Sequence, residues 1–306
     1  IMTALPLSFS PEVAAAQANG APIVALESTI ITHGMPFPQN LETARRVEAE
    51  VRAAGATPAT IAVMAGRIHV GLDDGTLERL ARTPDALKLS RADLAACLIS
   101  GRTGATTVAG TMIAAHLAGI DVFATGGIGG AHRGAETSFD ISADLHELAE
   151  TPVTVVAAGA KAILDLSKTL EVLETLGVPV IAYGQDDFPA FWSRSSGLKA
   201  PLRLDTAAAI AVAHRMRCAL GLPGGQLVAN PIPPEAEIPL AAITPAIETA
   251  LAEAEARGIT AKAVTPFLLD RIFALTEGRS LTANIALVLN NARLAAAIAR
   301  ELAGRR

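Results

Sequence analysis

The strongest constraint on the fold is a regular alternation of short apolar runs with longer segments of helical periodicity. Buried strands that alternate with helices form a layered sheet, so the sequence predicts an α/β fold rather than a sandwich or a helical bundle. The expected strands are residues 23–27, 60–64, 67–71, 121–125, 152–157, 178–182 and 226–229.

The expected helices are residues 40–54, 76–82, 91–99, 106–118, 161–176, 205–220, 245–257, 266–276 and 281–302. We therefore predict a three-layer α/β/α arrangement with a central mixed sheet and a helical C-terminal portion. No long linker divides the chain, so residues 1–306 are expected to form a single domain, with residues 1–20 as an N-terminal extension. A TIM barrel is the alternative, but eight regular strand–helix units are not found.

Composition excludes several classes of protein. Apolar residues make up 51% of the chain and charged residues 18%, which excludes a disordered protein. The net charge of −5 and the lack of a basic run argue against a nucleic-acid polymer as partner. The most apolar stretch, residues 105–119, is broken by polar residues, so no membrane span is expected. Two cysteines outside any CxxC pattern, and no recognisable leader, favour a cytoplasmic protein.

Common catalytic motifs are not found in the sequence. Residues 127–132 carry His132 where a dinucleotide-binding loop needs its last glycine. The phosphate-binding loop of P-loop proteins, GxSxG, HExxH and EF-hand patterns are also missing. A function must therefore be argued from individual residues.

Lys161 is the first of these residues. It follows the buried run 152–157 and is expected to open the helix 161–176. The partial positive charge of a helix N-terminus and an apolar setting both favour a neutral amine over an ammonium ion. A neutral amine attacks a carbonyl carbon to form a Schiff base, and α/β sheets bind ligands at such strand-to-helix turns. The alternative is a structural lysine paired with Asp165, four residues further on.

Glu27 is the second residue. It ends the apolar run 23–27 and precedes Ser28 and Thr29. A carboxyl group at the carboxyl end of a strand can act as general acid or base when its surroundings raise its pKa. The alternative is a capping or surface glutamate.

Asp140 and Asp144 lie on either side of Ser142. If Ser142 caps a helix, its hydroxyl group and the first-turn amides can bind an anion. A lone carboxylate completed by water suits a hard ion such as Mg²⁺ or Mn²⁺. From spacing alone, ordinary helix capping is the stronger interpretation.

Several residues are weaker candidates. Thr107 marks a helix start that could hold a phosphate, and Lys88 could add positive charge to such a site. His33 and His132 lie in glycine-containing loops without a second histidine at metal spacing, which favours structural roles. Asn284 is an amide within a predicted helix and could bind a base or amide ligand. Simple capping and packing remain the alternatives.

Together these residues describe an enzyme that acts on a sugar phosphate. The same segments resemble the pseudouridine-5′-phosphate glycosidase family, the indigoidine synthase A-like proteins. The matching segments follow the family's order across nearly the whole chain: residues 26–36, 104–108, 126–134, 140–145, 159–165, 284–288 and 290–292.

The resemblance implies reversible cleavage of the C–C glycosidic bond of pseudouridine 5′-phosphate to uracil and ribose 5-phosphate. It also implies an α/β/α fold, a divalent metal, usually Mn²⁺, and a homotrimer. Lys161 would be the nucleophile that holds the opened sugar as an imine, and Glu27 would protonate the uracil carbon. Asp140 would hold the metal, and Asn284 would complete the catalytic set near the base or the opened sugar. Substrate contacts are expected from Lys88, Thr107, Val108, His132, Ser142, Ala143 and Asp144.

Some members of the family are fused to a sugar kinase. The 306 residues leave no room for one, so a pseudouridine kinase is expected to be a separate protein. Two other hypotheses remain open. A Schiff-base lyase or aldolase acting on another sugar phosphate would keep the lysine and be indifferent to uracil. A non-catalytic nucleotide-binding or pigment-pathway accessory protein would bind without turnover, and the presence of both Lys161 and Glu27 argues against it.

Overall fold

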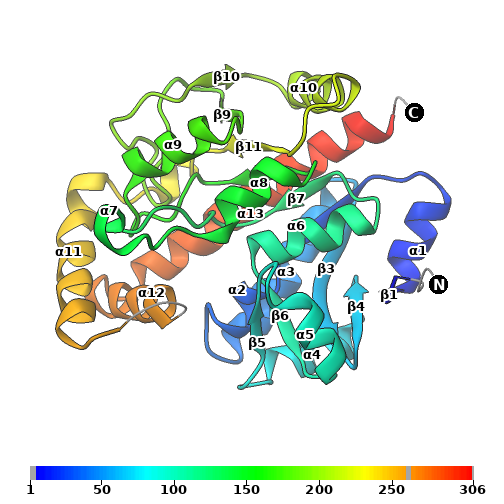
Figure 1. Ribbon diagram of the computed structural model, residues 1–306, viewed down its shortest axis with the longest axis horizontal. Helices are drawn as coiled ribbons and strands as arrows, with labels where there is room; N and C mark the ends of the chain where they lie inside the picture. The colour runs from blue at the N-terminus through cyan, green and yellow to red at the C-terminus, as the bar shows by residue number, and fades with distance from the viewer. Residues whose placement is uncertain (1–4, 260–262, 305–306) are drawn as a thin grey trace.

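The computed structural model describes residues 5–259 and 263–304. Its centre is a mixed sheet with the strand order β1-β4-β3-β2-β7-β8-β11-β9-β10, and β5 and β6 continue from β3 to one side (Figure 1). The strands are β1 (Leu7–Phe9), β2 (Ile23–Leu26), β3 (Thr57–Met64), β4 (Arg67–Val70), β5 (Leu87–Leu89), β6 (Gly104–Thr106), β7 (Val122–Ala124), β8 (Thr154–Ala157), β9 (Val180–Tyr183), β10 (Leu202–Leu204) and β11 (Gln226–Ala229). The pairs from β3 through β2, β7, β8, β11 and β9 to β10 are parallel, whereas β4 and β6 pair with β3 antiparallel.

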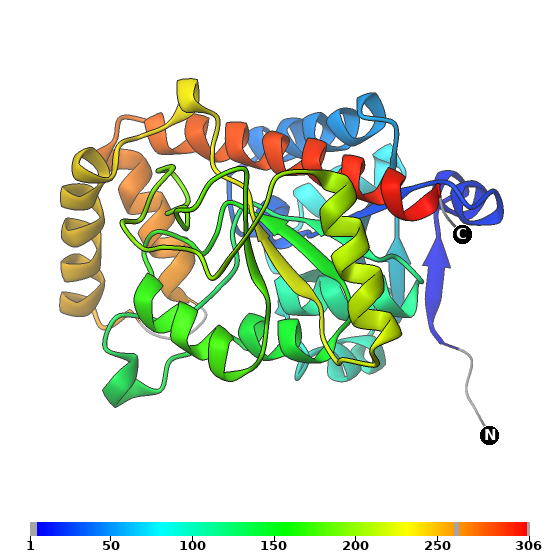
Figure 2. The ribbon, with the colours of Figure 1, turned by 90° about the horizontal axis from the view of Figure 1, so that it is seen from above.

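Helices cover both faces of the sheet. The α-helices are α1 (Pro11–Ala18), α2 (Thr29–Thr32), α3 (Gln39–Ala53), α4 (Asp74–Ala81), α5 (Leu94–Ser100), α6 (Val108–Leu117), α7 (Ala135–Ser138), α8 (Ala143–Glu150), α9 (Leu166–Thr175), α10 (Ala207–Ala219), α11 (Leu240–Ala256), α12 (Val264–Leu275) and α13 (Arg279–Ala303), with a short 3₁₀ turn η1 (Pro234–Ala236). Figure 2 shows α3 and α13 on one side of the sheet and α8 and α9 on the other. The predicted single α/β domain with three layers and a helical C-terminal portion is confirmed, and the sheet is open rather than a closed barrel.

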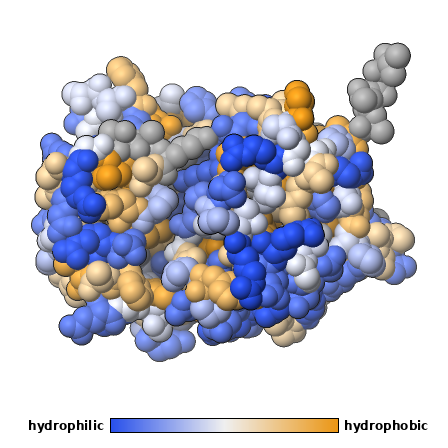
Figure 3. Space-filling view, turned by 90° about the horizontal axis from the view of Figure 1, so that it is seen from below, coloured by the Kyte–Doolittle hydropathy of each residue, from blue (hydrophilic) through white to orange (hydrophobic). Residues whose placement is uncertain are grey.

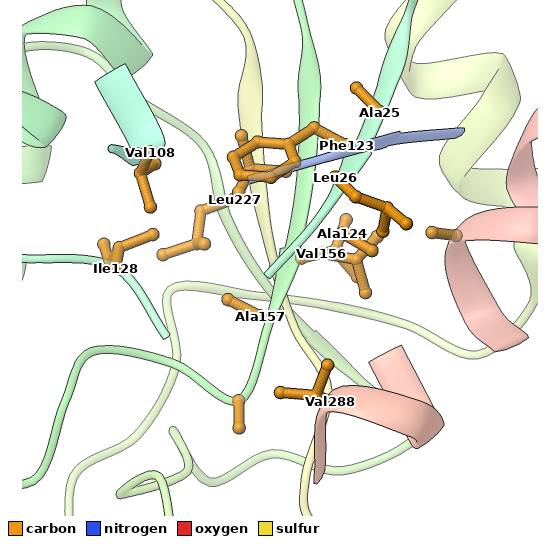
Figure 4. Packing of buried hydrophobic residues seen from close by; sticks show 14 of the residues in the cluster. Ala25, Leu26, Val108, Phe123, Ala124, Ile128, Val156, Ala157, Leu227 and Val288 are labelled. Carbon is orange, nitrogen blue, oxygen red and sulfur yellow. The ribbon is translucent and has the colours of Figure 1, made fainter. Parts of the chain in front are cut away.

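The central parallel strands β7, β8 and β11 are buried along their whole length. All four residues of β8 and of β11 are inaccessible, so helices must cover both faces of these strands. In Figure 4, Phe123 and Leu227 lie on one side of these strands, and Leu26, Ala124 and Val156 lie on the other. Val288 of α13 closes the core near Ala157.

Helix α13 has the length and hydropathy of a membrane-spanning helix, the one such helix in the described part of the chain. It nevertheless packs on β2, β7 and β8 and on helices α3 and α10, and 56% of its most apolar window is buried. Its apolar residues thus belong to the core of the domain. On the face in Figure 3, hydrophobic residues are scattered among hydrophilic ones rather than gathered in one band.

The N-terminal segment is better integrated than expected. Residues in the predicted extension form β1, which pairs with β4 in parallel, and α1, which packs against β3. The oxygen of Ser10 accepts a hydrogen bond from the amide of Val13, and Pro11 occupies the first helical position. The Ser-Pro-Glu order at residues 10–12 is a helix-start signal that could have located α1.

The expected hairpin at residues 60–71 is confirmed. Strands β3 and β4 are antiparallel, with Met64 opposite Arg67. The two turn residues, Ala65 and Gly66, both have positive φ, as a tight two-residue hairpin requires.

Candidate active site

Three neighbouring parallel strands end at one edge of the sheet, and each is followed by a predicted site residue. Glu27 follows β2, the glycine-rich segment 126–134 follows β7, and Lys161 lies beyond β8. A cavity of about 380 Å³ opens there. Its walls include every residue that the sequence singled out for the site: Glu27, Lys88, Thr107, Val108, His132, Asp140, Ser142, Ala143, Asp144, Lys161 and Asn284.

The glycine-rich segment runs along the cavity and contacts residues at both of its ends. It begins under the ring of Phe191, since a Cβ atom at Gly127 would lie 2.7 Å from that ring. Its next residue, Ile128, contacts the lysine: the backbone amide of Lys161 donates a 3.1 Å hydrogen bond to the carbonyl of Ile128. It continues to α8, where a Cβ atom at Gly129 would lie 2.3 Å from the Ser142 hydroxyl. Along the cavity, Phe191, Lys161 and Ser142 therefore follow one another in the same order as Gly127, Ile128 and Gly129 follow one another in the segment.

Glu27 is held by hydroxyl groups on both carboxylate oxygens. Thr29 donates a hydrogen bond to one oxygen and Thr125 donates to the other. Thr125 is itself buried, and its backbone carbonyl accepts a 2.8 Å hydrogen bond from the side-chain amide of Asn291 on α13. The carboxyl group thus has a fixed orientation at the edge of the cavity.

Lys161 does not open a helix, so the predicted effect of a helix N-terminus on its amine was wrong. Helix α9 begins at Leu166 because Asp165 caps it, with its carboxylate accepting from the amide and the ammonium of Lys168. The predicted alternative, an ion pair between Lys161 and Asp165, is not found either. Lys161 is half-buried in the connection between β8 and α9, and its Nζ has no hydrogen-bond or ion-pair partner within the described residues.

Two helix N-termini meet at the polar end of the cavity. Thr107 caps α6 and Ser142 caps α8, as expected from the sequence. Asp144 is 6% exposed and joins them, because its carboxylate accepts from the amides of Ala109 at 3.0 Å and Gly129 at 2.8 Å. The amide of Val108 has no acceptor among the described residues and lies at the cavity, as does the first-turn residue Ala143.

Lys88 lies at this same end, because β5 pairs with β6 and β6 leads into α6. The charge of Lys88 on β5 acts on both His33 and His132. Burial is the main cause that lowers the pKa of His132; the charges of Lys161 and Lys88 lower it further, while the carboxylate of Asp140 opposes them. Burial, followed by the charge of Lys88, also lowers the pKa of His33. Both imidazoles are therefore neutral near pH 7.

Asp140 offers one half-buried carboxylate to the cavity. No group of three or more histidine, cysteine or acidic residues that could hold a metal exists in the described ranges. This donor set does not suit a structural zinc site. It does fit a hard divalent ion, which is commonly bound by one or two carboxylates, by waters and by the phosphate of a substrate.

The opposite end of the cavity is apolar and carries one amide. Phe191 and Val288 line it together with Asn284 on α13. The indole nitrogen of Trp192 donates a 2.6 Å hydrogen bond to Oδ1 of Asn284. In Figure 4, Val288 lies on one side of the strand ends, and Val108 and Ile128 lie on the other.

Sequence reasoning missed the residues that support the site. Thr125 had a usable signal, because it is a polar residue at the end of a buried strand, as Glu27 is. Phe191 and Trp192 lie between β9 and β10, and Trp192 is the only tryptophan of the chain. No local pattern indicates their contact with α13, because it joins residues 92 positions apart.

Comparisons with known proteins agree with this site. The family model described as indigoidine synthase A like protein matches residues 12–301. A curated protein of Paracoccus denitrificans (strain Pd 1222), named pseudouridine-5′-phosphate glycosidase, is 75% identical, over 97% of this chain and 98% of that protein. A protein of the same name from Jannaschia sp. (strain CCS1) is 73% identical, over 97% of this chain and 99% of that protein.

Two solved structures share the fold. The prealnumycin C-glycosynthase AlnA, in complex with ribulose 5-phosphate, has a TM-score of 0.91 and 40% identity, with 99% of this chain and 98% of that chain covered. An indigoidine synthase A-like protein of Thermotoga maritima has a TM-score of 0.89 and 33% identity, with 98% and 97% covered. From its site and these relatives, the chain is an enzyme that belongs to the family of indigoidine synthase A-like proteins.

Proposed function

We propose that this enzyme reversibly cleaves the C–C glycosidic bond of pseudouridine 5′-phosphate to give uracil and ribose 5-phosphate. The observation that carries the proposal is the order of groups along the glycine-rich segment. An apolar end with one amide is followed by a lysine, and the lysine is followed by an end with Lys88, hydroxyl groups and helix N-termini. The substrate has the same order: base, C1′ and phosphate. The names of the relatives point to the same reaction.

The polar end suits the sugar phosphate. Lys88, the hydroxyl groups of Thr107 and Ser142, and the amide of Val108 can bind phosphate oxygens. Asp144 would repel a phosphate, but its oxygens can still accept from a sugar hydroxyl group. The solved relative with ribulose 5-phosphate supports a pentose phosphate as ligand.

Lys161 and Glu27 would carry out the bond cleavage. The neutral amine of Lys161 adds to C1′ while the C1′–O4′ bond breaks; O4′ gains one proton and the new C1′–N nitrogen loses one, which opens the ring and restores the nitrogen lone pair. Glu27 then protonates uracil C5, and the electron pair of the C1′–C5 bond remains with the base as the nitrogen lone pair forms the imine. Water releases ribose 5-phosphate and frees the lysine. A carbon leaving group requires this route, because no oxygen or nitrogen is available for protonation.

Asp140 would hold a Mn²⁺ or Mg²⁺ ion through its carboxylate, and such an ion would supply charge stabilisation to the bound sugar phosphate. His132 lies beside Lys161 and Asp140 and is neutral near pH 7. A neutral imidazole can accept the proton that the lysine nitrogen releases after it bonds to C1′. A homotrimer, a cytoplasmic location and a separate pseudouridine kinase remain part of the proposal, on the basis of the family resemblance.

Synthesis in the reverse direction tests the reaction. The protein is incubated with uracil, ribose 5-phosphate and Mn²⁺, and mass spectrometry follows a product equal to their sum minus water. We expect this product from the wild type, its loss in Lys161→Ala, and a strong reduction with a chelator. A protein that binds ribose 5-phosphate covalently but never incorporates uracil would instead be a Schiff-base lyase or aldolase for another sugar phosphate.

A further inference from the structure

We infer that Trp192 is a positioning residue that fixes the orientation of the Asn284 amide and so makes this point of the cavity selective for a carbonyl oxygen. The inference rests on the proposed function, because it assigns recognition of the base edge to the apolar end of the cavity. It names the feature that would let the enzyme accept uracil and refuse bases with an amino group at the same position.

The orientation of the amide follows from the chemistry of the indole. Trp192 is 1% exposed, and its Nε1 donates to Oδ1 of Asn284 at 2.6 Å and to the carbonyl of Ser280 at 3.2 Å. An indole N–H is a donor with no acceptor capacity, so the amide must turn its oxygen toward it. The opposite orientation would place two donors against each other. Asn284 therefore offers its NH₂ group to the cavity that it lines.

The indole cannot easily turn away from this position. Ser280 and Asn284 lie one helical turn apart on α13, so the indole N–H binds across that turn. The ring of Phe191 contacts Trp192 edge-on, with centroids 5.1 Å apart. Phe191 is fixed in turn by a 3.0 Å hydrogen bond from its amide to the carbonyl of Ala158. Phe191, which lines the cavity, and Trp192, which holds the Asn284 amide, are thus packed against each other.

A fixed NH₂ group discriminates between bases. Uracil carries carbonyl oxygens at both C2 and C4, whereas cytosine has an amino group at C4 and isocytosine has one at C2. An amino group placed against the NH₂ of Asn284 would leave two donors without acceptors. Such a mismatch reduces affinity by about tenfold or more.

Two variants separate the orientation of the amide from its presence. Trp192→Phe keeps an aromatic ring and removes the donor, so the amide can flip. Its KM for uracil should rise about tenfold, its KM for ribose 5-phosphate should stay within about twofold, and cytosine or isocytosine should become an inhibitor. Asn284→Asp keeps an acceptor for the indole but presents an oxygen to the cavity, so it should also raise the KM for uracil selectively.

The hydrogen bond itself can be observed without turnover. Trp192 is the only tryptophan, so ¹⁵N-labelled protein gives one indole signal. We expect this signal to shift in Asn284→Leu and to stay close to its wild-type position in Asn284→Asp. An unchanged signal in Asn284→Leu, or a Trp192→Phe variant with wild-type base discrimination, would overturn the inference. If Trp192→Phe raises both KM values together, its role is only structural and the inference is also overturned.

Failure of the proposed function gives a different pattern. In that case the wild type forms no product from uracil, whatever the indole signal does. A signal that still shifts in Asn284→Leu would then establish the hydrogen bond and overturn its assignment to base recognition.

Discussion

The carboxyl group of Glu27 accepts hydrogen bonds on both oxygens, from the hydroxyl groups of Thr29 and Thr125. Thr29 lies on the adjacent short helix α2, whereas Thr125 directly follows β7, the neighbouring strand of the sheet. A proton donor must face the reacting carbon at hydrogen-bond range, so its orientation is part of its function. These two hydroxyl groups provide that orientation.

Replacing Thr125 with valine removes one of the two contacts at nearly constant volume. We expect kcat to fall by about tenfold to a hundredfold, with both KM values within about twofold, because the lost contact positions the proton donor rather than the substrate. Steady-state kinetics in the synthesis direction measures this. Thr125→Ser restores the hydroxyl group and should recover most of the rate. Wild-type kcat in the valine variant, with a loss in the serine variant, would show that the methyl group, and not the hydroxyl group, matters.

His214 and Thr154 are buried and hydrogen-bonded to each other. The side chain of Gln226 donates a 3.1 Å hydrogen bond to the Thr154 hydroxyl group, which forms a second hydrogen bond, of 3.0 Å, with Nδ1 of His214. Burial is the main cause that lowers the pKa of His214. The pair therefore resists protonation in the folded protein.

Individual residues were predictable where they broke a local pattern. Lys161 and Glu27 stood out as charges beside buried strands, and both line the cavity. The hydrogen bonds that orient them were not predictable. Thr125 reaches Glu27 across 98 positions and Trp192 reaches Asn284 across 92, and such contacts depend on how strands and helices pack.

The glycine-rich segment after β7 needs its glycines because neighbouring side chains lie against it, and not because its backbone angles are unusual. Gly127, Gly129 and Gly130 all have ordinary φ, but a Cβ atom at each would overlap a neighbouring side chain. At Gly129 the neighbours are the Ser142 hydroxyl at 2.3 Å and the Asp144 carboxylate at 2.8 Å. The absence of side chains lets this segment run directly beneath the site.

Gly129→Ala should therefore disturb the polar end of the cavity. The added methyl group must displace Ser142 or Asp144, so we expect the KM for ribose 5-phosphate to rise at least about tenfold, with a loss of stability of about 1–3 kcal/mol. Gly75→Ala is a matched control, because its Cβ atom would meet only the Asp73 carboxylate at 3.5 Å, an ordinary contact. Kinetics and thermal melting of the two variants compare them. Wild-type kinetics in Gly129→Ala would contradict this account of the segment.

Elements were predicted well where burial alone determines them. The strand at residues 226–229 was predicted with its observed bounds, because a fully buried run between turns has few alternatives. The helix start expected at Lys161 was wrong, because the backbone of residues 161–165 bonds to the glycine-rich segment before Asp165 caps α9. Local pattern could not reveal that competition. Strands β1 and β5 were missed because three residues are too few to show a period.

For the whole molecule, burial of histidines links stability to pH. Four of the six histidines have a pKa lowered from the ordinary value of 6.5, with burial as the main cause: His33, His69, His132 and His214. As the pH falls through 6.5, the unfolded chain takes up protons at these positions and the folded chain does not. The free energy of unfolding therefore decreases as the pH falls, until the lower pKa values of the folded state are reached.

We expect the melting temperature to be several degrees lower at about pH 5.5 than at about pH 7.5. Carboxyl groups with lowered pKa values titrate below this window, whereas Glu48, whose pKa is raised mainly by burial, acts in the opposite direction. His214→Gln removes one of the four imidazoles and should flatten the dependence. Melting curves that are identical at the two pH values would contradict the prediction.

Trapping of the imine directly tests whether Lys161 binds the sugar covalently. The protein is incubated with ribose 5-phosphate, reduced with borohydride and digested, and the peptides are analysed by mass spectrometry. We predict one reduced sugar-phosphate adduct, on the peptide that contains Lys161, and none in Lys161→Ala. No adduct, or an adduct on Lys88 instead, would contradict the account.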